Sequence, residues 1–383
     1  MNPVTIAIVG AGFVADYYMT TLAGHPELAL AGAFDTDARR LTAFCAFHKV
    51  RSYPDFASTL ADKSVSIIVN LTTPHAHYAV SHSALEAGKH VYSEKPLAMD
   101  LGEAETLVAL AQSKGLVLAS APANGLSDAN MLVSDKLKSG TIGTPRLVYA
   151  EMEDGPVFRE KWQTWKSRSG AAWPGAHEFE IGCTLEHAGY ALSWLVGLFG
   201  PVETVTSFSA LTFPDKGESA HGHSLGADFS VGCLQFRSGV VARLTSGLAA
   251  PRDRSLTILG DRGSITVRDL WDNRSTVHLE EAGGSRPLLQ KIIRRAEGKL
   301  GKALPFKLVP GRKLSYPAAA ARNLPSYPSQ IDFMAGVAVQ ADMISGKRPA
   351  FYSGAVSLHI TELALALNQG QSLPQPYRVR NLF

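Results

Sequence analysis

Gly10-Ala11-Gly12-Phe13-Val14-Ala15 follows the apolar run Ile6-Ala7-Ile8-Val9, and Asp35 closes a second apolar run that begins at Leu28. This order predicts a buried strand, a glycine turn, a helix start, a second strand and an acid. Gly10 permits the tight turn, and Gly12 lets the backbone approach a pyrophosphate held by amides at the helix N-terminus. The pattern predicts a dinucleotide site, with an ordinary strand-to-helix turn as the alternative. Its residues are Gly10, Gly12, Phe13, Val14 and Asp35, whose carboxylate would bind the adenosine ribose.

Strands and helices continue to alternate up to about residue 121. Further strands are expected at 66–71, 89–94 and 116–119, and helices at 37–48, 75–87 and 101–113. Strands that read as continuous apolar runs between helices are typical of a parallel sheet covered on both faces. We therefore expect a doubly wound parallel sheet in an α/β domain formed by residues 1–121.

From about Arg146 the pattern changes to longer alternating strands. These are expected at 202–211, 227–236, 240–247, 255–258 and 264–267, with helices at 184–198, 329–345 and 354–367. Glycines between the strands indicate turns. The pattern predicts a C-terminal α+β domain over residues 122–383, with an open, mostly antiparallel sheet.

Length and composition describe a globular protein. A chain of 383 residues suggests two domains, and no apolar run reaches the length of a membrane span. The first strand begins within a few residues of Met1, which leaves no room for a secretion signal, so a cytoplasmic protein is expected. Its three cysteines are far apart and form no pair spaced for a metal, so no metal site is expected.

The net charge of +3 hides one strongly basic segment. Residues 286–313 hold nine basic residues and one acid, which leaves 28 basic and 33 acidic residues elsewhere. No general nucleic-acid surface is therefore expected. Leu289, Ile292, Ile293, Ala296 and Leu300 recur at helical spacing within it, which predicts a basic amphipathic helix. Such a helix could bind an acidic membrane surface, an acidic partner or a phosphorylated substrate. Alternatively, its apolar side could pack on its own sheet or on a sister subunit.

Two motifs follow predicted strands, at the carboxyl edge where open α/β sheets bind ligands. Thr72-Thr73-Pro74 with His77 is expected to contact the cofactor, although polar residues are also common at helix starts. Glu94-Lys95-Pro96 is more informative, because a lysine there would reach nicotinamide and carry the proton that accompanies hydride transfer. Both Glu94 and Lys95 are therefore assigned to the cofactor site, and Lys95 also to catalysis; a surface lysine paired with Glu94 is the alternative.

With these motifs the chain resembles the glucose-fructose oxidoreductase, inositol dehydrogenase and MocA-like family, written Gfo/Idh/MocA. The likeness rests on residues 10–15, on Thr73-Pro74 and a following histidine, on 86–98 and on 138–143. Ile331-Asp332-Phe333 and residues 358–363 also resemble the closing helices of the family.

The resemblance implies a Rossmann domain that holds NAD or NADP, a sugar, sugar acid or cyclitol in the cleft, and Lys95 as the proton-transfer residue. It also implies that the open sheet of the second domain forms a homo-oligomer. Asp35 favours NAD, because a carboxylate repels a 2′-phosphate. Arg39 and Arg40 follow closely and weaken that preference, so NADP remains open.

The chain departs from the family pattern in the helix that carries the second catalytic group. Relatives often have Leu-x-Asp-x-Gly-x-His, and alignment on Leu185 and Gly189 puts His187 at the aspartate position and Ala191 at the histidine position. His187 could itself serve as acid or base. Glu186 lies about 100° round an α-helix from it, so both side chains cannot face the cleft equally. We expect His187 to assist Lys95, with Glu186 as the alternative and a packed histidine as a further one.

A segment dense in indoles and cations precedes that helix and is the expected substrate loop. Indole faces bind sugar rings and charged groups read hydroxyls or a carboxylate, although tryptophan is also a frequent core residue. The substrate-binding candidates are Trp162, Trp165, Arg168, Trp173, Glu186, His187 and Asn124.

These features predict an NAD(P)-dependent dehydrogenase or reductase acting on CH–OH groups of a sugar-like substrate. A related enzyme that oxidises a sugar transiently, eliminates a glycosidic substituent and recycles NAD is a second hypothesis. A non-catalytic dinucleotide sensor or partner-binding subunit is a third, suggested by Ala191 and the basic helix.

Overall fold

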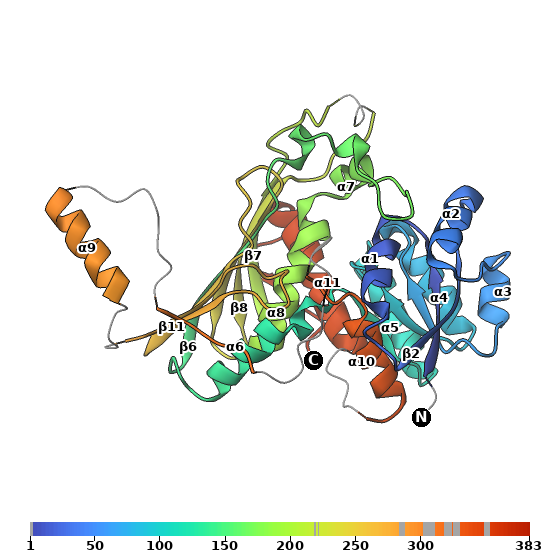
Figure 1. Ribbon diagram of the computed structural model, residues 1–383, viewed down its shortest axis with the longest axis horizontal. Helices are drawn as coiled ribbons and strands as arrows, with labels where there is room; N and C mark the ends of the chain where they lie inside the picture. The colour runs from blue at the N-terminus through green and yellow to red at the C-terminus, as the bar shows by residue number, and fades with distance from the viewer. Residues whose placement is uncertain are drawn as a thin grey trace.

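Two sheets lie side by side in the computed structural model, and helices fill the space between them (Figure 1). The structure describes residues 3–217, 220, 222–282, 288–301, 311–317, 324, 330–347 and 353–383. The sheet built from the N-terminal part lies at the right of the view, and the second sheet lies at the left.

The first sheet is parallel throughout and has the strand order β2-β1-β3-β4-β5. Its strands are β1 (Val4–Val9), β2 (Leu28–Phe34), β3 (Ile67–Asn70), β4 (His90–Ser93) and β5 (Leu118–Ser120). The helices are α1 (Phe13–Leu22), α2 (Ala38–His48), α3 (Phe56–Ala61), α4 (His77–Glu86) and α5 (Leu101–Ser113). The chain leaves β1 toward β2 and returns to β3 on the other side, so the glycine turn after β1 lies at the switch point where such folds bind ligands.

Within the described residues the second sheet has nine strands, of which only β6 and β9 pair in parallel. The strands are β6 (Pro145–Glu153), β7 (Val202–Ala210), β8 (Phe229–Phe236), β9 (Val241–Gly247), β10 (Leu256–Gly260), β11 (Gly263–Val267), β12 (Val277–Glu281), β13 (Arg312–Lys313) and β14 (Tyr377–Arg378). An N-terminal parallel sheet followed by a mostly antiparallel one confirms the predicted fold class. The sequence patterns missed β6, β12, β13 and β14.

Helices cover one face of the second sheet and leave the other open. They are α6 (Asp128–Lys138), α8 (Gly189–Phe199) and α11 (Gly354–Gln369), and their core includes the buried Trp194. Side chains alternate along the strands, so the outward positions include Tyr149 on β6, Phe208 on β7 and Val241 on β9, which are 37%, 48% and 41% exposed.

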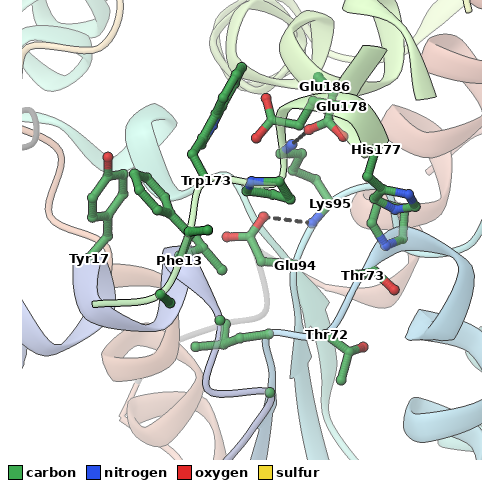
Figure 2. Close-up of a pocket in the computed structure, with 18 of the residues that line it drawn as sticks. Phe13, Tyr17, Thr72, Thr73, Glu94, Lys95, Trp173, His177, Glu178 and Glu186 are labelled. Atoms are coloured by element: carbon green, nitrogen blue, oxygen red, sulfur yellow. Dashed lines mark hydrogen bonds and ion pairs between the residues drawn. The ribbon is translucent and has the colours of Figure 1, made fainter. Parts of the chain in front are cut away.

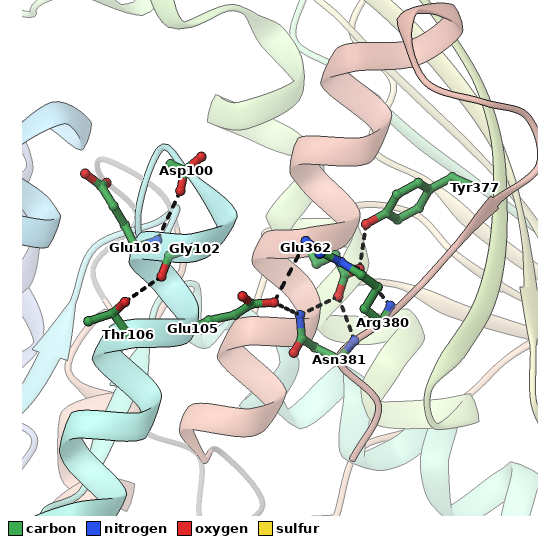
Figure 3. Close-up of polar contacts among 9 residues, drawn as sticks. All are labelled: Asp100, Gly102, Glu103, Glu105, Thr106, Glu362, Tyr377, Arg380 and Asn381. Carbon is green, nitrogen blue, oxygen red and sulfur yellow. Dashed lines mark hydrogen bonds and ion pairs between the residues drawn. The ribbon is translucent and has the colours of Figure 1, made fainter.

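The last helices connect the two sheets. The helix α10 (Ala335–Ile344) contributes Val337 and Ala338 to the core around β1, so the chain returns to the first sheet after completing most of the second. The helix α11 packs on both α5 and β7. Figure 3 shows how the chain end is attached to it. The buried Glu362 accepts hydrogen bonds from the Tyr377 hydroxyl and from the backbone amides of Arg380 and Asn381, at 2.7, 2.8 and 2.9 Å.

The predicted basic helix is present as α9 (Leu288–Leu300) and lies apart from both sheets (Figure 1). The rest of the basic segment, residues 286–287 and 302–310, lies outside the described residues. Among the helices that the structure describes, none has both the length and the apolar character needed to span a bilayer.

Candidate active site

A cavity of about 1200 Å³ lies where the carboxyl edge of the first sheet faces the second part of the chain. The glycine turn, the ends of β2, β3 and β4, the segment 154–174 and the turn at 184–190 all contribute to its wall. One cavity therefore joins the predicted dinucleotide site to Lys95, Glu186 and His187. Figure 2 shows this junction.

The glycine turn has the geometry that the sequence predicts for it. Gly10 has a φ of +96°, and a Cβ there would lie 2.6 Å from the backbone of Leu71, so both conformation and space require glycine. Gly12 precedes α1, and a Cβ on it would meet no atom of the described protein within 4 Å. The first amides of α1 thus face open space beside Phe13 and Val14, which also line the cavity.

Asp35 ends β2 at the edge of the same cavity, but its carboxylate already has partners. It accepts hydrogen bonds from the Ala11 amide at 2.7 Å and from Arg40 Nε at 2.9 Å, and Arg40 Nη2 lies 2.6 Å from its second oxygen. Asp35 is therefore tied to the glycine turn, and of the two arginines that the sequence analysis noted, Arg40 pairs with it.

The loop after β3 lines the cavity through Thr72, Thr73, Pro74 and His77. The imidazole of His77 is fully buried and bridges two carbonyl groups, that of Thr72 at 3.0 Å and that of Pro96 at 2.7 Å. Burial lowers the pKa of His77 despite these carbonyl groups. His77 thus holds the loops after β3 and β4 together.

Lys95 follows β4 and reaches into the cavity, as Figure 2 shows. Its Nζ contacts Glu186 Oε2. Burial alone would lower the pKa of Lys95, but the charges of Glu186 and Glu94 outweigh burial and raise it, so the amine stays protonated. Glu94 also accepts the Lys95 amide at 3.0 Å and the Tyr18 hydroxyl at 2.8 Å, and so fixes the position of this turn.

Glu186 and His187 both line the cavity, because residues Thr184–Ala188 form a π-helical turn before α8. The sequence analysis assumed an α-helix, in which successive residues are about 100° apart. A π-helix has more residues per turn, so neighbouring side chains diverge less, and such turns are frequent at functional sites. Glu186 and His187 can therefore both line the cavity and need not be alternatives.

Asp154 holds His187 in place from the end of β6. His187 Nε2 lies 3.0 Å from Asp154 Oδ2, and Arg254 Nε lies 2.8 Å from the other oxygen of that carboxylate. Burial would raise the pKa of Asp154, but His187 and Arg254 lower it to about 2, so the carboxylate is ionised. Within the described residues His187 Nδ1 is buried and has no hydrogen-bond partner. If Nε2 carries the proton, the Nδ1 lone pair is therefore left without a donor among the described residues.

A second glutamate, Glu178 of α7 (Gly175–Ile181), lies beside Glu186 in Figure 2. Burial and the neighbouring Glu186 raise the pKa of Glu178 well above its ordinary value, although Lys95 and Trp173 act in the opposite direction. A carboxyl group in such surroundings can hold a proton near neutral pH.

The indole-rich segment is divided between the cavity and the core. Trp165 and Trp173 line the cavity, with ring centroids 5.0 Å apart. Trp162 is 5% exposed and packs in a small core with Phe179. Arg168 lies over the ring of Phe47 and does not line the cavity. The expected substrate contacts of Trp162 and Arg168 are thus not supported by their positions.

The position of Asn124 also differs from the expectation. Its side-chain amide is buried, donates to the carbonyl groups of Tyr190 and Leu270 at 3.0 Å each, and accepts from Ser193 Oγ at 2.9 Å. Both N–H groups and the oxygen of this side chain thus already have partners inside the protein.

The sequence analysis missed several residues that line the cavity. Asp154 follows directly after a strand that was not predicted. Tyr190 lies one helical turn beyond Glu186, a spacing that could have revealed it. Arg254 and Trp271 reach the site from distant parts of the chain. The Arg254 guanidinium carbon lies over the Trp271 ring, 3.6 Å from its centroid.

The cysteines and metal ligands add no further chemistry. Cys183 is fully buried, and burial raises the pKa of its thiol to about 12, so it is not a reactive thiolate. No cluster of metal-ligand side chains is found in the part of the chain that the structure describes.

Comparison with known proteins gives matches along most of the chain. Residues 4–121 match the model of an oxidoreductase family with an NAD-binding Rossmann fold, and residues 131–266 match the GFO/IDH/MocA C-terminal domain. An uncharacterised oxidoreductase of Schizosaccharomyces pombe is 29% identical over 54% of this chain and 54% of its own length. UDP-N-acetylglucosamine 3-dehydrogenase of Acidithiobacillus ferrooxidans is 32% identical over 38% of this chain and 44% of its own. The chain thus spans about half the length of these relatives.

Among solved structures, an oxidoreductase from Agrobacterium radiobacter in complex with NAD+, L-tartaric acid and magnesium superposes with a TM-score of 0.72. It covers 98% of each chain at 18% sequence identity. The two chains thus share a fold over almost their whole length.

Proposed function

Because the chain belongs to the GFO/IDH/MocA family of oxidoreductases, we propose that it interconverts a secondary alcohol and a ketone on a sugar, sugar acid or cyclitol with NAD or NADP. The observation that carries this proposal is the position of Lys95. Its ammonium group lies in one cavity with the glycine turn and contacts Glu186.

The residues at the first sheet suit a dinucleotide. Gly12 leaves space in front of the α1 amides, which would bind the pyrophosphate. Asp35 and Arg40 would meet the adenosine ribose, where a carboxylate suits free hydroxyls and a guanidinium suits a 2′-phosphate. A nicotinamide cofactor bound there supplies or accepts the hydride.

Lys95 would hold the substrate oxygen and supply its proton. A lysine with a raised pKa is protonated at neutral pH, so it can hydrogen-bond a ketone oxygen and give up its proton as that oxygen gains charge. In the opposite direction an unprotonated group must receive the alcohol proton, and the Glu186 carboxylate in contact with Nζ is one such group.

His187 offers a second proton acceptor. Asp154 orients the imidazole through Nε2, and the His187 side chain lines the cavity, while its buried Nδ1 has no partner among the described residues. We propose that His187 assists Lys95. It would act either as a proton acceptor or as a hydrogen-bond partner of a neighbouring substrate hydroxyl.

A polyhydroxylated substrate agrees with the rest of the wall. Glu178 and Glu186 provide carboxyl groups for hydroxyls, and Trp165 and Trp173 provide flat apolar faces. UDP-N-acetylglucosamine 3-dehydrogenase, the relative named above, acts on a sugar nucleotide, which keeps sugar nucleotides within the proposed class.

The test is turnover of a panel of sugars, sugar acids, cyclitols and sugar nucleotides, followed by the absorbance of reduced cofactor. Lys95→Met should lower turnover by about 100-fold or more while calorimetry with NAD+ and NADP+ gives unchanged affinity. Lys63→Met, which changes an exposed lysine outside the cavity, is the matched control.

Undiminished turnover in Lys95→Met would refute the assigned role. If the protein cleaves a glycoside while no reduced cofactor accumulates, the NAD-recycling reaction would be the correct function in place of a dehydrogenase. Cofactor binding without turnover on any member of the panel would favour a sensor.

A further inference from the structure

The helix α9 is not needed to connect the strands on either side of it. Strands β12 and β13 pair directly, with His278 opposite Lys313 and Leu279 opposite Arg312. Antiparallel neighbours can be joined by a turn of a few residues. Residues 282–311 are inserted instead, and Figure 1 shows α9 outside both sheets.

The sequence of α9 is divided into an apolar face and a basic face. Positions 288, 289, 292, 293, 296 and 300 are apolar and share one side of a helix with 3.6 residues per turn. Lys or Arg occupies 291, 294 and 295 on the other side of the helix and 299 at the edge of the apolar side, and Glu297 is the one acid of the helix sequence. On this face Ile292 is 54% exposed, and Ile293 and Ala296 are partly exposed.

We propose that α9 binds an anionic lipid surface, lying in the plane of the headgroups with its apolar face toward the acyl chains. This combination of a narrow apolar face and a lysine- and arginine-rich polar face is typical of interfacial helices. A helix of this length is marginal in water by itself, so a surface that buries its apolar face also stabilises its fold.

The charges favour lipid over a second copy of the chain. Outside residues 286–313 the chain carries 28 basic and 33 acidic residues, an imbalance too small to attract a strongly basic helix. Two copies of α9 would bring like charges together. An anionic leaflet instead attracts each basic residue close to it, and this attraction weakens as salt rises.

Flotation with vesicles tests the proposal on the full-length protein. Vesicles of phosphatidylcholine alone are compared with vesicles that also contain phosphatidylglycerol, at low and high salt. The protein should bind only the anionic vesicles, and less at high salt. Arg294→Glu with Arg295→Glu should weaken binding by about thirtyfold or more, because each basic residue contributes about fivefold. Ile292→Asp should weaken it by about tenfold or more through loss of apolar contact.

The matched control is Lys63→Glu with Lys138→Glu, which makes the same change of charge at two exposed lysines distant in sequence from α9. It should bind anionic vesicles almost as the unmodified protein does. Every variant should still bind the cofactor, which verifies that it is folded. Because vesicle binding is measured without turnover, its outcome does not depend on the dehydrogenase assignment. Equal binding to both vesicle types, or binding unaffected by the α9 changes, would overturn the proposal. So would self-association without lipid that Ile292→Asp abolishes, since a second copy would then cover the apolar face.

Discussion

At the scale of single residues, acidic side chains surround the Lys95 amine in the site. Lys95 contacts Glu186, and Glu178 lies close to that carboxylate. His187, Asp154 and Arg254 form a second series of ion pairs in the wall of the same cavity. The first group keeps a proton on Lys95, and the second fixes the orientation of the His187 imidazole.

Glu186→Gln should lower the pKa of Lys95, because it removes the charge that opposes burial. A single opposite charge at this distance shifts a pKa by about one to three units. The reactivity of the Lys95 amine toward an acylating reagent should therefore begin at lower pH, as should the alkaline loss of ketone reduction. Labelling against pH, followed by mass spectrometry, measures this without a known substrate. Glu103→Gln on the exposed side of α5 is the control, and an unshifted labelling curve would show that Glu186 does not set the proton affinity.

Arg40→Ala should shift cofactor preference toward NAD. The guanidinium partly neutralises Asp35, so its loss leaves a full carboxylate to repel a 2′-phosphate. We expect affinity for NADP to fall about tenfold more than affinity for NAD, as measured by calorimetry. Arg51→Ala, whose side chain pairs with Asp62 outside the cavity lining, should leave both affinities unchanged. Equal losses for both cofactors would contradict this role.

At the scale of elements, the fold was more predictable than the site. Gly10 could be located from sequence because the turn requires glycine, and Asp35 and Lys95 because the end of a strand fixes the direction of each side chain. Glu186 and His187 were treated as alternatives, because nothing in Thr184–Ala188 distinguishes a π-helical turn from an α-helix. Trp162 and Asn124 were assigned to substrate because residue type does not reveal burial, which depends on segments distant in sequence.

The segment that carries Trp165 and Trp173 is attached to α1 at a single acid. Ser169 donates to Asp16 Oδ2 through its amide at 3.2 Å and its hydroxyl at 2.7 Å, and His48 lies 2.5 Å from the other oxygen. Burial alone would raise the pKa of Asp16, but these hydrogen bonds lower it. The attachment therefore lies beside the cofactor end of the cavity, where Gly170 and Tyr17 line the wall.

Ser169→Ala should speed cofactor release, because it removes the hydroxyl hydrogen bond that ties this segment to α1. One hydrogen bond to a charged group contributes about 1.5–3 kcal/mol, so release should become about tenfold faster or more. Stopped-flow displacement of bound cofactor measures the rate. Ser113→Ala at the exposed end of α5 should not change it, and an unchanged rate in Ser169→Ala would mean that the segment does not limit release.

At the scale of the whole molecule, we propose that the uncovered face of the second sheet binds a second copy of the chain. Register and alternation bring Tyr149, Phe208, Val241 and Cys233 to that face, and covering such side chains is favourable. A self-complementary dimer through this face, as implied by the family resemblance, remains a proposal.

Phe208→Asp should weaken that assembly, because it places a charge in the middle of a face that would be buried. Analytical ultracentrifugation over a range of concentrations should show the unmodified protein as an oligomer and the variant as a monomer. Phe47→Asp is the matched control, since Phe47 is similarly exposed at 49% but lies on α2. A monomer at every concentration for the unmodified protein would exclude the proposed assembly.

Because α10 returns to the first sheet and α11 packs on both sheets, the two sheets should not unfold independently. The core around β1 is completed by Val337 and Ala338, and α11 is packed against both α5 and β7. Neither sheet can lose its cover without exposing part of the other, so the protein should denature as one cooperative unit. A gene cut between residues 121 and 122 would accordingly yield a first half with a bare apolar surface.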